Sequence, residues 1–212
     1  MAHMIDEKLV TQVFLNAVDP NAPVSFRIES IGNLIITSGQ IAASDPLVCP
    51  DPQPFTRRVP NGEYPVTLAI AILEGGDERV AFARVDFTQG PINHWEMAVI
   101  NGQLVEDLQD DEMFGYGVDA GTGCFMDIDT SHALTKRMGE NDRYFLDIIE
   151  FLDETYRHTW SWANFKPDPE SAGNIVAFSS GYGDGFYASY FAIGGDHKPI
   201  ALITDFAIIG NV

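Results

Sequence analysis

Basic residues are scarce in this 212-residue sequence, which has 12 Lys and Arg against 31 Asp and Glu and a formal net charge of −19. Phosphate backbones repel such a surface unless basic residues cluster, and the only adjacent Lys and Arg residues are the two isolated pairs Arg57-Arg58 and Lys136-Arg137. The composition therefore argues against nucleic-acid binding. The acidic residues are interpreted either as a solvated coat or as a field that attracts a basic partner.

Long apolar runs and cysteines are scarce as well. No apolar run approaches the roughly 18 residues that a membrane span needs, and no basic segment followed by an apolar one predicts a signal peptide. We therefore expect a cytoplasmic protein that does not contact a membrane. The two cysteines, Cys49 and Cys124, are too few for a disulfide scaffold and lie in no zinc-binding spacing, but a bridge between them stays open.

The remaining composition is ordinary for a globular protein, with 45 % hydrophobic residues. The length suits a single domain over residues 1–212. Met1-Ala2-His3 before Met4 resembles a cloning remnant. Prolines crowd the segment 44–65 and cannot donate ladder hydrogen bonds, so this segment is predicted to be an irregular connection.

The clearest structural pattern is "YPVTLAIAILEGGDERVAFARVDF", two β-type runs joined by Gly75-Gly76. Glycines permit the positive φ angles of a hairpin turn, and "IGGDHK" near the end of the chain predicts a second Gly-Gly-Asp hairpin turn. Helical spacing predicts a short helix over 6–16 and two more over 131–160, the first stopping at Gly139 and the second capped by Asn141. Without βαβ alternation, this order predicts an α+β fold, a largely antiparallel β-sheet or β-meander with a segregated helical segment near residues 131–160.

Two short motifs repeat one pattern on either side of the helical segment. Gly115-Tyr116-Gly117 is followed by Asp119, and Gly181-Tyr182-Gly183 is followed by Asp184. If these loops meet, Asp119, Asp127 and Asp184 could form a carboxylate cluster that holds calcium or magnesium, because hard cations prefer oxygen ligands. Alternatively, Asp184 and Asp119 could act as a general base and its orienting partner. The simpler interpretation is that each Asp caps its own turn.

Cys124 is a weaker catalytic candidate. It could act as a nucleophile if His94 or His132 lay beside it, but a buried structural cysteine explains the same residue.

Taken together, the segments "PNGEYPV", "ERVAFARV", "GYGVDAGTGCFMD", "SSGYGDGFY" and "LITDFAII" resemble the domain-of-unknown-function 4241 family, which is uncharacterised and mainly bacterial. The resemblance runs from about Ile41 to the C-terminus. It implies a single-domain protein and names no activity. Its glycine-and-aspartate motifs fall on Asp119, Gly121, Asp127, Gly183, Asp184 and Gly185.

Two functions are weighed. The first is a binding or immunity-type module that neutralises a basic protein, because the charge is strongly negative and no catalytic triad is visible. The second is a small hydrolase or metal-dependent enzyme that uses the carboxylates of the two glycine loops.

Overall fold

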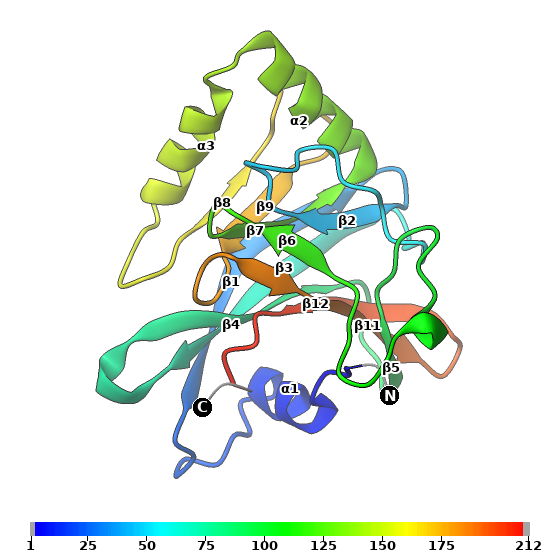
Figure 1. Ribbon diagram of the computed structural model, residues 1–212, viewed down its shortest axis with the longest axis vertical. Coiled ribbons are helices and arrows are strands. Elements are labelled where there is room, and N and C mark those ends of the chain that lie inside the picture. Colours follow the sequence, from blue (N-terminus) through cyan, green and yellow to red (C-terminus); the bar gives the residue numbers. More distant parts are fainter. Residues whose placement is uncertain (1–2, 210–212) are drawn as a thin grey trace.

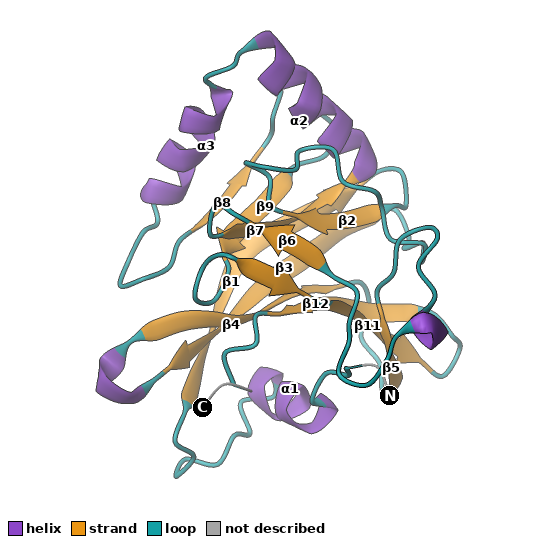
Figure 2. Cartoon of the chain, in the orientation of Figure 1, coloured by secondary structure: helices purple, strands orange, loops and turns teal. Residues whose placement is uncertain are grey.

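The computed structural model describes residues 3–209 (Figure 1). Strands fill the middle of the molecule, and two of its helices stand together at one end (Figure 2). The α+β prediction is confirmed, since every strand pair is antiparallel and the two paired helices are consecutive. No helix within the described residues is long and apolar enough to cross a membrane.

The larger sheet has six strands in the order β1-β3-β4-β12-β11-β5. Its central strands are buried on both faces, as the apolar runs on either side of Gly75-Gly76 predict. The bounds are β1 Ser25–Ile36, β3 Gly62–Ile72, β4 Glu78–Asp86, β5 Ile92–Met97, β11 Ser189–Gly194 and β12 Pro199–Asp205, with a 3-10 turn, η1, at Glu74–Gly76.

A second sheet has four strands in the order β2-β7-β9-β8, and β10 and β6 form a separate two-stranded ribbon. The bounds are β2 Ile41–Ser44, β7 Thr122–Asp127, β8 Trp162–Phe165, β9 Ile175–Ser179, β6 Tyr116–Val118 and β10 Gly185–Tyr187, and a 3-10 turn, η2, spans Val105–Asp107. Aromatic rings join the sheets: Phe178 of β9 contacts Phe125 of β7 and also Phe206, which follows β12.

The helices are α1 Glu7–Phe14, α2 Ile128–Glu140 and α3 Tyr144–Asp153. The prediction for the ends of α2 and α3 was wrong in two respects. Helix α2 begins three residues earlier than predicted and continues through Gly139 to Glu140. Asn141 is the C-cap of α2, and α3 begins at Tyr144 without a side-chain cap. The early start follows from Asp127, which supplies the N-cap.

The Pro-rich connection is shorter than predicted, because β3 already begins at Gly62. Pro65 therefore lies inside β3, opposite Asn33 of β1. Proline has no N–H to donate, and the β1–β3 register shifts at this point, between Ser30 and Asn33. Gly32 occupies the shift with a φ of 96°, so the bulge absorbs the proline.

A partly buried ion pair, between Arg27 and the buried Glu78, ties the six-stranded sheet to the segment that follows α3. Both carboxylate oxygens of Glu78 accept hydrogen bonds from Arg27, at 3.1 and 2.7 Å, and the indole N–H of Trp160 donates to the same carboxylate at 3.0 Å. The bond to Arg27, helped by Trp160, lowers the pKa of Glu78 from 4.5 to about 2. Because the folded pKa is depressed, this carboxylate stabilises the protein above pH 4.5 and loses that effect as pH falls towards 2.

We predict that Glu78→Gln lowers the free energy of unfolding by about 2–4 kcal/mol at pH 7, because Arg27 loses its buried counter-charge. Urea titrations of wild type and variant at pH 7, 4 and 2.5 measure this difference in unfolding free energy. The deficit should shrink between pH 4 and pH 2.5, because the unfolded Glu78 takes up a proton below pH 4.5 while the folded carboxylate still holds its charge, so the ion pair stabilises the folded state less. Glu74→Gln, in the exposed turn of the same hairpin, is the control, and an equal loss from both variants would contradict the prediction.

Candidate functional site

The two Gly-Tyr-Gly-Asp segments meet in space. Strand β6 begins at Tyr116, inside the first Gly-Tyr-Gly, and pairs with β10, which follows the second. The register places Val118 opposite Gly185, so Asp119 follows the last paired residue of β6 and Asp184 precedes the first paired residue of β10. A Cβ built on Gly121 would lie 3.8 Å from the Cα of Gly183, so the loops touch.

A buried carboxylate from elsewhere shapes the first loop. Asp45 has no exposed surface, and its Oδ2 accepts the backbone N–H groups of Asp119 at 3.1 Å and Ala120 at 2.7 Å. Its Oδ1 accepts the N–H of Leu47 at 3.0 Å. Asp45 therefore joins the start of the Pro-rich connection to the loop, and Asp119 does not cap its own turn.

Ser180 and Tyr187 shape the second loop. The N–H of Ser180 donates to the carbonyl of Gly121 at 3.1 Å, and the Ser180 and Tyr187 hydroxyls both donate to the carbonyl of Gly183, at 2.9 and 2.8 Å. Burial, with a smaller effect of the Asp184 carboxylate, raises the pKa of Tyr187, so its hydroxyl keeps the proton that it donates. Asp184 does not cap its turn either.

The two aspartates are consequently left at the surface. Both are exposed, and no hydrogen bond or ion pair within residues 3–209 uses either carboxylate. Two half-exposed rings lie in the same segment, Tyr182 at 54 % and Phe186 at 50 %. The guanidinium of Arg79 lies 5.4 Å from the centre of the Tyr182 ring. Carboxylates beside aromatic rings form a surface suited to a cationic side chain.

Asp127 has a different role from its two predicted partners. It is fully buried at the far end of β7, about 16 Å along the strand from Thr122. Its oxygens accept the N–H groups of Thr37, Ser38 and Asp129 at 3.0, 2.9 and 2.9 Å, and both hydroxyls of Thr37 and Ser38 donate to it as well. Asp127 caps α2 and fastens the β1–β2 turn to it.

The predicted carboxylate cluster of Asp119, Asp127 and Asp184 is therefore not formed. The first and third lie on the ribbon, but the second is at the other end of β7 with its oxygens already bonded. Over the described range, 3–209, no group of three or more His, Cys, Asp or Glu side chains is arranged to hold a metal ion.

Cys124 is a buried structural residue. Burial raises the pKa of its thiol to about 12, and its Sγ lies 3.8 Å from the hydroxyl of Ser44. The proposed bases have other partners, since His94 bonds Glu96 at 2.9 Å and His132 faces Asp51 at 3.9 Å. Cys49 is exposed, and both cysteines are free, so the open question of a bridge is answered.

A family model described as "protein of unknown function (DUF4241)" matches residues 34–204, from the last residues of β1 to the end of β12. The chain belongs to the DUF4241 family. Searches of curated proteins and of solved structures returned no match. The matched part of this DUF4241 protein contains both glycine loops and Asp45, while α1 lies before it.

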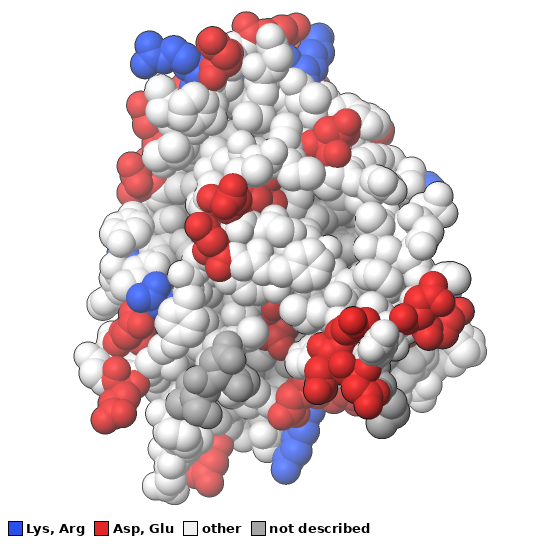
Figure 3. Space-filling model, in the orientation of Figure 1, with Lys and Arg blue, Asp and Glu red and all other residues white. Residues whose placement is uncertain are grey.

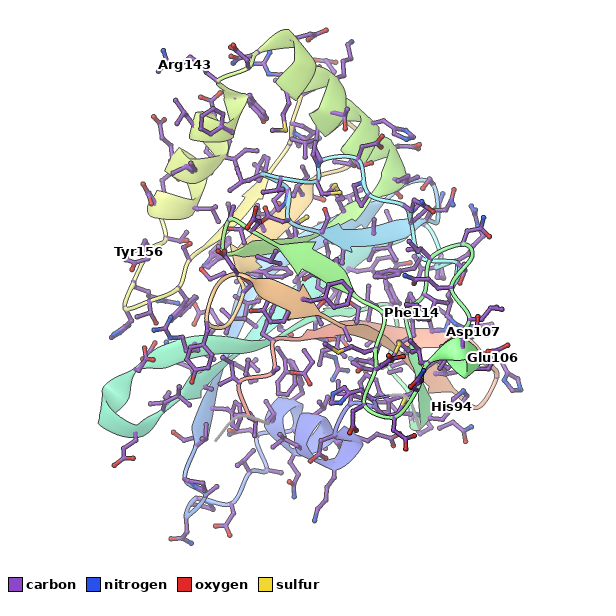
Figure 4. The ribbon with its side chains drawn as sticks, in the orientation of Figure 1. His94, Glu106, Asp107, Phe114, Arg143 and Tyr156 are labelled. Atoms are coloured by element: carbon purple, nitrogen blue, oxygen red, sulfur yellow. The ribbon has the colours of Figure 1, made fainter. Side chains whose placement is uncertain are left out.

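Sequence reasoning missed two features of this surface. Asp45 lies in the Pro-rich segment, and the two loop N–H groups that it accepts are 74 and 75 residues away in the sequence. No local pattern therefore indicates its role. The run "EDLQDDE" at 106–112 was a visible signal, with five exposed acids around and after η2. Glu106 and Asp107 belong to η2, which lies away from α2 and α3 (Figure 4). Figure 3 shows acidic side chains over this segment and over the end of the β6–β10 ribbon, on one face of the molecule.

We predict that Asp127→Asn lowers the free energy of unfolding by about 2–3 kcal/mol, because an amide nitrogen replaces one acceptor of a fully bonded, buried carboxylate. Asp129→Asn removes the same charge from the exposed first turn of α2 and should cost less than about 1 kcal/mol. Urea denaturation of both variants gives the comparison. Equal losses of unfolding free energy in the two variants would mean that Asp127 stabilises the protein only through its charge near the start of α2, and not through its buried hydrogen bonds.

Proposed function

We propose that this DUF4241 protein is a binding module for a basic protein partner, of the kind that immunity proteins represent, and that it acts in the bacterial cytoplasm. The observation that supports this proposal is the pairing of the two glycine loops. It brings Asp119 and Asp184 to the same end of the ribbon, one position beyond the Val118–Gly185 pair, with their carboxylates unbonded and the exposed rings of Tyr182 and Phe186 in the same segment as Asp184. We call these four residues the ribbon surface.

The chemistry of the ribbon surface favours an arginine or lysine from the partner. A guanidinium binds a carboxylate through paired hydrogen bonds and lies flat on an aromatic ring. The contact of Arg79 with Tyr182 shows this ring already accepting a guanidinium within the protein. Phe186 has no such contact among the described residues and offers its ring to the partner.

The loops are organised before a partner arrives. Asp45, Ser180 and Tyr187 fix their backbones through hydrogen bonds that do not involve the ribbon surface. A surface that is already ordered loses less conformational entropy on binding, which favours affinity. The net charge of −19 and the acidic run at 106–112 add a long-range field that speeds the approach of a basic protein.

We predict that Asp119→Asn/Asp184→Asn abolishes capture of a basic partner from lysate. The matched control is Glu106→Gln/Asp107→Asn, which removes the same charge from the other acidic segment. Immobilised wild type and control should retain one basic protein that elutes between about 0.15 and 0.5 M salt, as screening predicts. Mass spectrometry of the retained proteins identifies it.

Phe186→Ala tests the same contact with the partner independently, because this substitution changes no charge. It should weaken capture by about tenfold while the salt dependence stays as in wild type. Retention of the same proteins by all variants, or equal loss from both double variants, would show that the ribbon surface is not the contact.

A metal-dependent hydrolase is the second candidate, because Asp119 and Asp184 flank the same end of two paired strands. Calcium takes 6–8 oxygen ligands and magnesium about six, so two exposed carboxylates form a weak site.

We predict that 5 mM calcium or magnesium raises the melting temperature by less than about 1 °C, since weak ligands stabilise little at this concentration. Differential scanning fluorimetry of wild type and Asp119→Asn/Asp184→Asn tests it. A larger rise that the double variant loses would favour the metal site over the protein partner.

A further inference from the structure

A cavity of about 470 Å³ lies between α1 and the face of the six-stranded sheet that α1 covers. Its lining comes from α1, four strands of the sheet and the loop between β4 and β5. The residues that matter below are Phe14, Thr67, Arg84, Asp86, Gly90 and Trp95. Two neighbouring hollows share parts of this lining. A volume in this range is typical of small-molecule sites.

The sheet register creates a charged pair on one wall of the cavity. Thr67 of β3 pairs with Arg84 of β4, and Asp86 lies two residues further on the same face. The Nε and Nη2 atoms of Arg84 donate to a single oxygen of Asp86, Oδ1, at 2.8 and 2.5 Å. The Phe14 ring covers the guanidinium at 4.9 Å. Only 15 % of the Arg84 side chain is exposed, so the pair is held in place.

This geometry leaves two polar groups of the pair unused. Across residues 3–209, no hydrogen bond engages Oδ2 of Asp86 or Nη1 of Arg84. The pair therefore offers an acceptor and a donor at one place. Its two charges cancel, and the net charge of −19 disfavours an anion. Phe14 and Trp95 provide aromatic walls, which favour a flat ligand.

We propose that this cavity binds a flat, uncharged aromatic molecule that carries a hydrogen-bond donor next to an acceptor, as an aromatic amide or a lactam ring does. The ligand amide donates to Oδ2 of Asp86 and accepts from Arg84, while its ring lies against Trp95. The site is separate from the ribbon surface and does not depend on the proposed function.

The family match divides the site in two. Thr67, Arg84, Asp86 and Trp95 lie within residues 34–204, but Phe14 and the rest of α1 lie before them. The polar wall and the Trp95 ring thus belong to the part that the family model matches, and the Phe14 ring belongs to the preceding segment.

The test uses three probes of one size and shape, benzamide, benzoate and benzamidine, which differ only in the charge of the head group. Nuclear magnetic resonance titration of the full chain follows the Trp95 indole signal, assigned with Trp95→Phe. Benzamide should bind with a Kd of about 1–10 mM, as expected for so small a ligand, and at least about threefold tighter than the two charged probes.

Two variants and one control complete the design. Asp86→Asn should weaken benzamide about tenfold through loss of a charge-assisted hydrogen bond. Asp77→Asn, from the similar Arg79–Asp77 pair outside the cavity, should leave the Kd unchanged. Gly90→Leu should block the cavity without a loss of melting temperature, because the nearest atom to a Cβ there is 3.6 Å away.

Each contrary result overturns the proposal. Absence of an indole shift at about 20 mM benzamide, tighter binding of benzoate or benzamidine, or unchanged binding to Gly90→Leu would each do so. Equal effects of Asp86→Asn and Asp77→Asn would show that the carboxylate acts only through the overall charge.

Discussion

The buried carboxylate of Asp45 is the constraint on which the candidate site depends. It lies where β2 ends and the Pro-rich connection begins, with no exposed surface. A buried carboxylate is costly unless it is bonded, and here three backbone N–H groups satisfy it. Because two of them belong to the first glycine loop, the same interaction that stabilises the connection also sets the conformation of the loop beside β10.

Two further acids act in the same way at other junctions. Asp127 fastens the β1–β2 turn to α2, and Glu78 fastens β1 and β4 to the segment after α3. All three are buried and saturated with hydrogen bonds. An acidic composition therefore serves two separate purposes in this protein: a few carboxylates hold elements together, and the exposed majority gives the surface its charge.

The sequence predicted the parts of the fold whose signals are local. The Gly75-Gly76 hairpin and the helices near 131–160 follow from turn residues and periodicity within short windows, and the structure contains both. The repeated Gly-Tyr-Gly-Asp pattern correctly drew attention to two segments that meet. The role of each aspartate was harder to predict, because it depends on donors far along the chain: Thr37 and Ser38 are 90 and 89 residues from Asp127. For the same reason, nothing local distinguished the buried Asp127 from the exposed Asp119 and Asp184.

The position of β12 has a consequence for how the chain folds. This strand lies between β4 and β11 in the six-stranded sheet, although it comes last among the strands in sequence. Until residue 205 has left the ribosome, β1, β3 and β4 have no bridge to β11 and β5, and one edge of β4 stays unpaired. Sheets that need such distant pairings form slowly and expose apolar edges meanwhile. The six-stranded sheet is therefore expected to close only once β12 is available, with the half-built sheet as the state most prone to aggregate.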